Sequence, residues 1–390
     1  MPARRPTGAT DRPRWGAFGL VCLAYLAATT GEALISPAFP SAAQDLGLDL
    51  ALAGSAFAVL TAAIATANLV GGSLLPRLGT TRVIVAGALL GATGALVSAT
   101  AQGFGQLAAG QALLGAGAGL HFPAGLHAVG ALAGPRRKGF AMGIYGVAFS
   151  AGLTLAAVLA AAGADSGWRL SFVLAAVLAT AAALATSRLR MPRITPPATR
   201  APMRAILGTP TAVGAVGALS QYGTVSFLTV FAVDEWGLTA ASAATLLAVG
   251  RVLSIGAKLV SGASADRRGP RASGRRTGAV LVATGLAWAL LPPSIPVYVL
   301  AAVFAGTVSS IFPIANLLAL EGFGQQGGAL GLYRSVQIGV GSLVTFLIGV
   351  LGHSLGLRPV ITAAVLIPGA LLWICREPAP AAAPAPAEAG

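Results

Sequence analysis

The sequence predicts an all-α integral membrane protein whose twelve membrane-spanning helices form two six-helix bundles. Three observations lead to this fold class: the composition, the apolar runs and an internal repeat. Hydrophobic residues make up 56% of the 390 residues and charged residues only 9%, whereas a soluble globular protein carries about 25% charged residues. A chain with so few charges cannot cover a water-facing surface, so we expect lipid around most of it.

Breaking the chain at charged and turn residues leaves twelve apolar runs, each close to the roughly 20 residues that a helix needs to cross a bilayer. Many of the glycines and prolines lie within these runs, as membrane helices tolerate. The predicted spans are 15–37, 51–75, 83–101, 105–132, 139–163, 168–186, 207–233, 240–265, 277–292, 295–319, 328–352 and 358–375.

The polar segments between these runs divide the chain into five parts. We expect a cytoplasmic N-terminal arm, a six-helix bundle, a cytoplasmic linker, a second six-helix bundle and a disordered cytoplasmic tail. In the same order, these parts are residues 1–14, 15–186, 187–206, 207–375 and 376–390. The arginines before the first apolar run resemble the start of a signal peptide, but more apolar runs follow at once. We therefore expect that run to remain as the first span.

Lysine and arginine fall mainly on one side of the predicted topology. With the N-terminus inside, 20 of the 25 lysines and arginines lie in segments on the inner side, in agreement with the positive-inside rule. We therefore expect a multi-pass protein of the cytoplasmic (inner) membrane with both termini in the cytoplasm. The formal net charge of +14 reflects this topology. Nucleic acid is not an expected partner, because binding it would require a contiguous basic face, which the sequence lacks.

The two halves of the chain repeat at an offset of about 190 residues. Gly72 and Gly79 align with Gly262 and Gly269, around the loop that follows the second span of each half. The other coincidences are Gly47-Leu48 with Gly237-Leu238, Phe122-Pro123 with Phe312-Pro313, Gly143-Ile144-Tyr145 with Gly331-Leu332-Tyr333, and Gly167-Trp168-Arg169 with Gly356-Leu357-Arg358. Such ordered coincidences predict two six-span halves in the same orientation.

Local motifs add a resemblance to a known family. The segment from Gly262 to Arg271, GASADRRGPR, resembles the loop signature of the major facilitator superfamily (MFS): a glycine, an aspartate four residues on, then basic residues around a second glycine. The first half departs from the signature, because Pro76 stands where the aspartate belongs. Span four resembles the family pattern with Gln111 in place of its arginine. The resemblance covers nearly the whole chain and implies the MFS fold and transport by alternating access.

The resemblance also implies a gate at the cytoplasmic ends of the spans. Asp266 corresponds to the family's carboxylate that holds the halves together, and we expect it to meet the start of span five, near Lys138 and Gly139. Because Pro76 offers no carboxylate, we expect an asymmetric gate. The other predicted gating residues are Gly262, Gly269, Arg267, Arg271 and Lys258. Two alternatives stay open: Asp266 as a solvated loop charge, and Lys258 snorkelling to the membrane interface.

Ionisable residues within spans cost roughly 2.5–3.5 kcal/mol each on insertion scales, so they mark candidate functional sites. Arg251 is a candidate for binding an anionic substrate group; the alternative is a structural ion pair with Glu32. Glu32 is the candidate proton-coupling residue, or else an interfacial residue that reaches water. His121 is a candidate for both substrate binding and proton coupling, beside Pro123, where we expect a broken helix; it is otherwise a hydrogen-bonded structural residue.

The remaining candidates for substrate binding lie in the second half. Arg334 in span eleven is a candidate for substrate binding, with an inner-gate or snorkelling role as the alternative. Gln221, Tyr222 and Asn316 are uncharged candidates for hydrogen bonds to substrate. Three basic residues against one carboxylate within the spans favour a small organic anion, because an anion would offset the excess charge.

These observations favour a secondary active transporter of a small organic anion, coupled to protons or to exchange. The alternative is proton-coupled efflux of drugs or hydrophobic metabolites. The sequence contains no phosphate-binding loop, no catalytic constellation and no metal-ligand spacing among its two cysteines and three histidines. We therefore expect no enzyme activity, cofactor or metal. The expected partners are a small-molecule substrate and the lipid bilayer, around a monomer.

Overall fold

The computed structural model describes residues 14–48, 50–134, 136–191, 202–238, 240–324 and 326–376. Most of the predicted N-terminal arm, the middle of the predicted linker and most of the predicted tail lie outside the described residues. Within the described ranges all regular structure is helical, in agreement with the predicted fold class.

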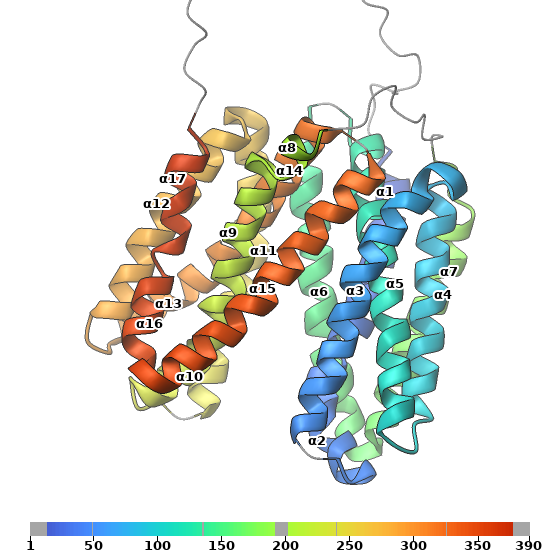
Figure 1. Ribbon diagram of the computed structural model, residues 1–390, viewed down its shortest axis with the longest axis horizontal. Coiled ribbons are helices and arrows are strands. Elements are labelled where there is room, and N and C mark those ends of the chain that lie inside the picture. The colour runs from blue at the N-terminus through green and yellow to red at the C-terminus, as the bar shows by residue number, and fades with distance from the viewer. Residues whose placement is uncertain are drawn as a thin grey trace, which may run out of the picture.

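The first half contains seven helices. They are α1 (Trp15–Ala33), α2 (Ile35–Leu46), α3 (Leu50–Leu78), α4 (Thr80–Ala99), α5 (Phe104–Leu132), α6 (Lys138–Ser166) and α7 (Trp168–Ser187). In Figure 1 they form one bundle, coloured blue to green. Each of the first six predicted spans coincides with one of these helices, and α2 extends the first span beyond a break at Leu34.

The second half is more interrupted. Its elements are α8 (Met203–Ile206), α9 (Thr209–Gly223), η1 (Val225–Phe227), α10 (Leu228–Asp234), α11 (Ala240–Arg268), α12 (Pro270–Leu290), α13 (Ile295–Val308), α14 (Ile311–Phe323), α15 (Gly327–Leu355), α16 (Leu357–Ala364), η2 (Ile367–Gly369) and α17 (Ala370–Ile374). By length and composition, ten segments among the described residues are candidate spans. The other two predicted spans lie on α12 and α15, so the twelve predicted spans all fall on helices.

The backbone carries the internal repeat that the sequence predicts. Helices α3 and α11 are equally long and begin at equivalent positions of the repeat, and α6 and α15 are likewise equal in length. Eight glycines among the described residues have a positive φ, a conformation that other residues rarely adopt, and they form four pairs at nearly one offset. The pairs are Gly47 and Gly237 (64° and 65°), Gly79 and Gly269 (81° and 83°), Gly134 and Gly324 (71° and 59°), and Gly167 and Gly356 (94° and 88°).

The helix breaks do not all fall where the sequence suggested. Pro123 lies inside a continuous α5, so the predicted break beside His121 is wrong. Span ten, the repeat counterpart, does break, at Ser309–Ser310 between α13 and α14. A membrane helix tolerates proline where neighbouring helices pack closely around the freed backbone groups, and residues 117–129 of α5 are all buried.

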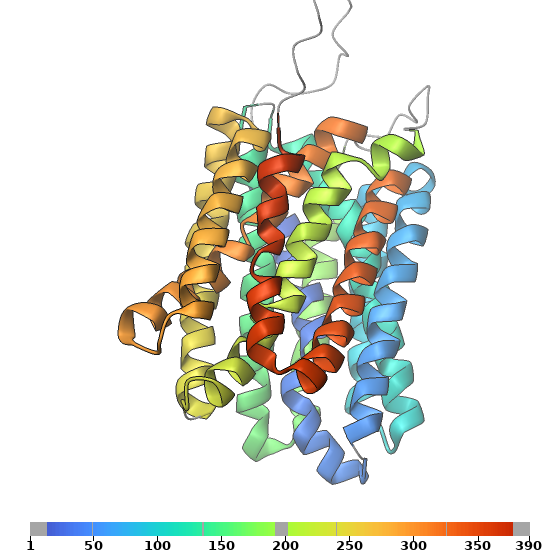
Figure 2. The same cartoon turned by 60° about the vertical axis from the view of Figure 1, so that its left-hand side comes forward.

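The two halves meet near one end of the molecule. We call this the basic end, because it holds Arg77, Arg137 and Arg268 at helix termini. There α6 packs on α11 and α3 packs on α15, and the last two lie side by side in both views (Figures 1 and 2). Towards the opposite end α3 and α15 diverge (Figure 1). The two halves are therefore in contact at the basic end, and α3 and α15 lie apart at the other.

Candidate functional site

Asp266, near the end of α11, bridges the two halves at the basic end. Its Oδ1 accepts a hydrogen bond from the Gly139 N–H at 2.7 Å, and its Oδ2 accepts one from the Phe140 N–H at 2.8 Å. Both donors belong to the first turn of α6, where backbone N–H groups have no partner within the helix and the helix dipole favours an anion. The predicted contact between Asp266 and the start of span five is confirmed, and a purely solvated Asp266 is wrong.

Lys258, two turns before Asp266, crosses the same seam. Its Nζ donates to the Gly146 carbonyl oxygen at 3.1 Å and to the Ser150 hydroxyl, both on α6. The side chain is only 4% exposed, and its ammonium lies 5.6 Å from the ring centroid of Phe149. The snorkelling alternative for Lys258 is therefore wrong, because its ammonium is hydrogen-bonded to a carbonyl and a hydroxyl of α6 and does not extend to the membrane interface.

The other predicted gating residues surround this seam. A methyl group on Gly262 would lie 2.9 Å from the carbonyl carbon of Gly139, so α6 and α11 touch through their backbones. Gly269 has a φ of 83° and turns the chain from α11 into α12. Arg267 is exposed, and Arg271 interacts electrostatically with Glu321 of α14. Their gating roles stay predictions.

The seam between α3 and α15 lacks such charges. A methyl group on Gly72 would lie 2.6 Å from the carbonyl carbon of Gly327, and the Ser335 hydroxyl donates to the Ala65 carbonyl oxygen at 2.8 Å. The first turn of α15 has no acidic residue, and Pro76 occupies the position that corresponds to Asp266. The two contacts at the basic end are thus asymmetric, as expected.

Arg334 of α15 lies where the halves face each other. The centre of its guanidinium is 4.5 Å from the ring centroid of Phe122, which belongs to α5 of the first half. Its Nη1 donates to the Gln337 Oε1 at 3.0 Å. The same guanidinium interacts electrostatically with Tyr25 and Glu32 of α1 and with Tyr222 of α9, besides Tyr333 beside it. The structure therefore brings Glu32, Tyr222 and Arg334 together from three helices.

Arg251 does not belong to this cluster. Only two ion pairs within 4.0 Å occur among the described residues, and neither contains Arg251 or Glu32. The alternative of a structural ion pair between these two residues is therefore wrong. Arg251 is exposed, and Glu32 interacts electrostatically with Arg334 instead.

His121 is part of a ring stack that includes Tyr25, which interacts electrostatically with Arg334. Its imidazole lies parallel to the Tyr25 ring, with centroids 5.3 Å apart, and Tyr25 stacks in turn on Tyr145 at 4.1 Å. His121 is 0% exposed, and within the described part of the chain neither of its ring nitrogens has a hydrogen-bond partner. In this conformation the ring supports Tyr25 by packing and has no exposed edge for a substrate, and it is not the hydrogen-bonded structural residue of the alternative.

The uncharged candidates are engaged with neighbouring side chains. Ser309 donates its hydroxyl to the Gln221 Oε1 at 3.2 Å, which ties α9 to the break between α13 and α14. Asn316 accepts a hydrogen bond from the Tyr333 hydroxyl at 2.9 Å, so it holds the residue next to Arg334. Tyr222 is 36% exposed and is the most accessible of the three.

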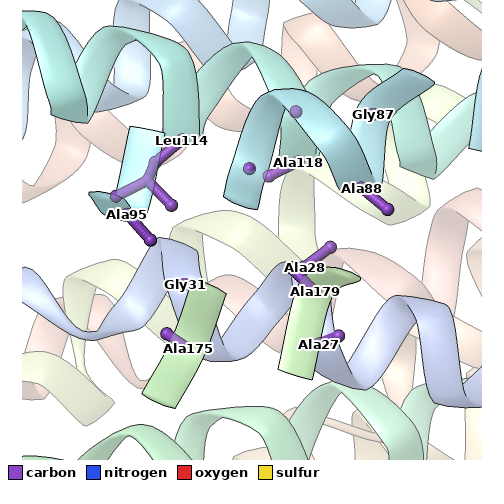
Figure 3. Close-up of a pocket in the computed structure, with 12 residues that line it drawn as sticks. Ala27, Ala28, Gly31, Gly87, Ala88, Ala95, Leu114, Ala118, Ala175 and Ala179 are labelled. Atoms are coloured by element: carbon purple, nitrogen blue, oxygen red, sulfur yellow. The ribbon is translucent and has the colours of Figure 1, made fainter. Parts of the chain in front are cut away.

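A separate crevice lies inside the first bundle. Figure 3 shows it between α1, α4, α5 and α7, where Ala27, Gly87, Ala118 and Ala175 are among its lining residues. Its free volume is about 10 Å³, room for about one water molecule. The small residues let these helices pack closely, and the crevice is too small for an organic substrate.

Comparisons with known proteins agree with this architecture. The sequence model of the Major Facilitator Superfamily matches residues 21–345 of this chain. The chain belongs to this superfamily of transporters. No curated protein matches it in sequence.

Solved structures of the superfamily share the fold. The E. coli fucose:proton symporter FucP has a TM-score of 0.74 at 18% identity, over 93% of this chain and 98% of that chain. FucP in the outward conformation has a TM-score of 0.77 at 17% identity, over 92% of this chain and 97% of that chain. The human organic anion transporter MFSD10 has a TM-score of 0.75 at 15% identity, over 94% of this chain and all (100%) of that chain.

Proposed function

We propose that this chain is a secondary active transporter that moves a small organic anion across the cytoplasmic membrane by alternating access, coupled to protons or to exchange. Membership of the superfamily supports transport. The anionic substrate rests on one observation: Arg334 lies between the two halves, on the ring of Phe122, and none of the ion pairs in the described part of the chain neutralises it.

The surroundings of Arg334 suit an anion. A guanidinium has five N–H donors in a plane that matches a carboxylate, and one of its nitrogens is already directed to Gln337. Moving an uncompensated cation out of water is expensive, so an anion that pairs with it would offset that cost. The organic anion transporter MFSD10 has the same fold, which supports the view that this architecture can accommodate such substrates.

Glu32 is the proposed coupling residue. Its carboxylate interacts electrostatically with Arg334, so it competes with a substrate anion for the same guanidinium. Protonation of Glu32 removes that competition and strengthens anion binding, which links the proton to the substrate. We assign His121 a supporting role beneath Tyr25. Arg251, exposed on α11, stays a second candidate for binding the anion, which would contact it before it reaches Arg334.

The seam at the basic end is the proposed gate. Asp266 and Lys258 on α11 hold α6, and both must release it when the halves part at that end. We place the basic end and both termini in the cytoplasm, because the cytoplasmic loops of membrane proteins carry an excess of lysine and arginine. The conformation described above is then the one that opens to the outside, and one chain forms a complete transporter as a monomer.

A thermal-shift screen and a transport assay test the proposal. Purified protein is melted with acetate, succinate or benzoate and, separately, with tetraphenylphosphonium, a lipophilic cation; stabilising anions are then followed by counterflow in liposomes. We expect at least one anion to stabilise the wild type and to be exchanged. Arg334→Gln should lose this stabilisation, whereas Arg188→Gln, an exposed control at the end of α7, should keep it. Stabilisation by the cation alone would contradict the anionic substrate.

A further inference from the structure

Gln337 lies one turn after Arg334 on α15 and was not singled out by its sequence context. Its Oε1 accepts the hydrogen bond from Arg334 Nη1 at 3.0 Å, and the side chain is only 1% exposed. A residue three positions along a helix lies on the same face as its partner. Gln337 therefore contacts the Arg334 guanidinium from the same helix, within the second half.

Gly214 of α9 makes room for this glutamine. A Cβ added to Gly214 would overlap the Gln337 Nε2 and lie 2.9 Å from its Cδ. Any larger residue at position 214 would push the amide away, so the helix contact fixes the side chain. Within the described residues the buried Nε2 makes no hydrogen bond of normal geometry, although the Gln337 side chain interacts with the Tyr333 hydroxyl. A buried amide donor without a well-formed hydrogen bond is unfavourable, so packing alone does not explain a glutamine there.

We propose that Gln337 is a positioning residue for the anion site: its neutral carbonyl oxygen holds one edge of the Arg334 guanidinium and leaves the other edges, and the whole charge, to the substrate. This inference rests on the proposed function. A glutamate of the same shape would accept the same hydrogen bond but would neutralise the arginine. The groups that face Arg334 from the surrounding helices are Tyr25 and Glu32 of α1, Tyr222 of α9, Tyr333 of α15 and the uncharged ring of Phe122.

The experiment compares four variants by titrating succinate and benzoate, with melting temperature as the readout, between pH 5 and 8. Gln337→Glu should weaken anion binding about tenfold or more at pH 8, because it places a carboxylate on the guanidinium. The loss should shrink as the pH falls and the new carboxylate is protonated, since the protonated acid still offers a carbonyl oxygen. Gln337→Met and Gly214→Ala should weaken binding at every pH, because they remove or displace the acceptor without adding charge.

Gln111→Glu is the matched control. Gln111 is also fully buried and donates from its Nε2 to the Ser98 hydroxyl at 3.1 Å, but it lies in the first bundle on α5. Gln111→Glu should leave the anion affinity and its pH profile as in the wild type. Every variant is compared with the wild type at the same pH, so that the effect of Glu32 titration cancels.

Three results would overturn the inference, and they are distinguishable. If the wild type binds anions and Gln337→Glu follows the same pH profile as the wild type, Gln337 has no positioning role and the proposed function stands. If the wild type binds neither succinate nor benzoate, nor any other anion of the screen, the proposed function and this inference fall together. A pH-independent loss in Gln337→Glu equal to that in Gln337→Met would assign the glutamine to packing alone.

Discussion

The two seams at the basic end have the same backbone and different side chains. In both, two long helices approach so closely that a single methyl group would collide with a carbonyl, at Gly262 in one seam and at Gly72 in the other. Yet α11 carries Asp266 and Lys258, where α3 carries Pro76 and Asn68 at the equivalent positions of the repeat.

The difference separates two physical tasks. Glycine in both seams sets how closely the halves approach, which depends only on backbone shape. Charge in one seam sets how firmly that contact holds, because Asp266 interacts with the exposed N–H groups of α6 and the first turn of α15 meets no acid from α3. The contact between the halves is therefore symmetric in geometry and asymmetric in electrostatics.

The largest expected effect comes from filling either glycine contact. Gly262→Leu and Gly72→Leu should each prevent closure at the basic end, because overpacking of about 1–3 kcal/mol shifts the equilibrium about 5- to 150-fold towards separation. Hydrogen–deuterium exchange at the starts of α6 and α15 should rise in both variants. Gly256→Leu is the control, since nothing lies within 4 Å of a Cβ at that position of α11. A strong effect in only one seam would mean that the two contacts are not equivalent in shape.

A smaller effect is expected from the charge. Asp266→Asn should weaken the α6–α11 contact by about 0.3–2 kcal/mol, a shift of about 2- to 30-fold, because an amide interacts less with a helix N-terminus than a carboxylate does. The amides of Gly139 and Phe140 should then exchange faster, with no change at the start of α15. The converse variant, Pro76→Asp, should slow exchange at Gly327 and Gly328, since it supplies the missing acid. Equal exchange in the wild type, Asp266→Asn and Pro76→Asp would show that the carboxylate does not strengthen a contact that the glycines already form.

Sequence patterns predicted the seams better than they predicted the centre. The helices, the repeat and the partner of Asp266 follow from local composition and from one offset, which fix where helices begin and end. Arg251 and Arg334 are both arginines within spans, and only the rotation and crossing of the helices decide that Arg334 packs on Phe122 and interacts electrostatically with Glu32. Arg334 and Gln337 are three residues apart and so lie on one helix face, and this spacing is the sequence feature that indicates their contact.

The ends opposite the seams repeat a further contact. Arg169 at the start of α7 pairs with Asp45 at the end of α2, and in the second half Arg358 at the start of α16 pairs with Glu235 at 2.9 Å. Hydrogen bonds from Arg169 and then from Trp168 hold the pKa of Asp45 below its ordinary value. A carboxylate whose pKa is lowered by folding stabilises the folded state above the ordinary aspartate pKa of about 3.9, and this contribution disappears as the pH falls through the lowered value.

Removing this charge should have the smallest effect of the three changes. Asp45→Asn should lower the melting temperature slightly at pH 6 and should melt like the wild type at the most acidic pH that the protein survives. The effect stays small because the pair is exposed to water. Asp234→Asn, another exposed carboxylate at the same end, should follow the wild type throughout. A difference between Asp45→Asn and the wild type that persists undiminished into acid would show that this contact acts through shape and not through charge.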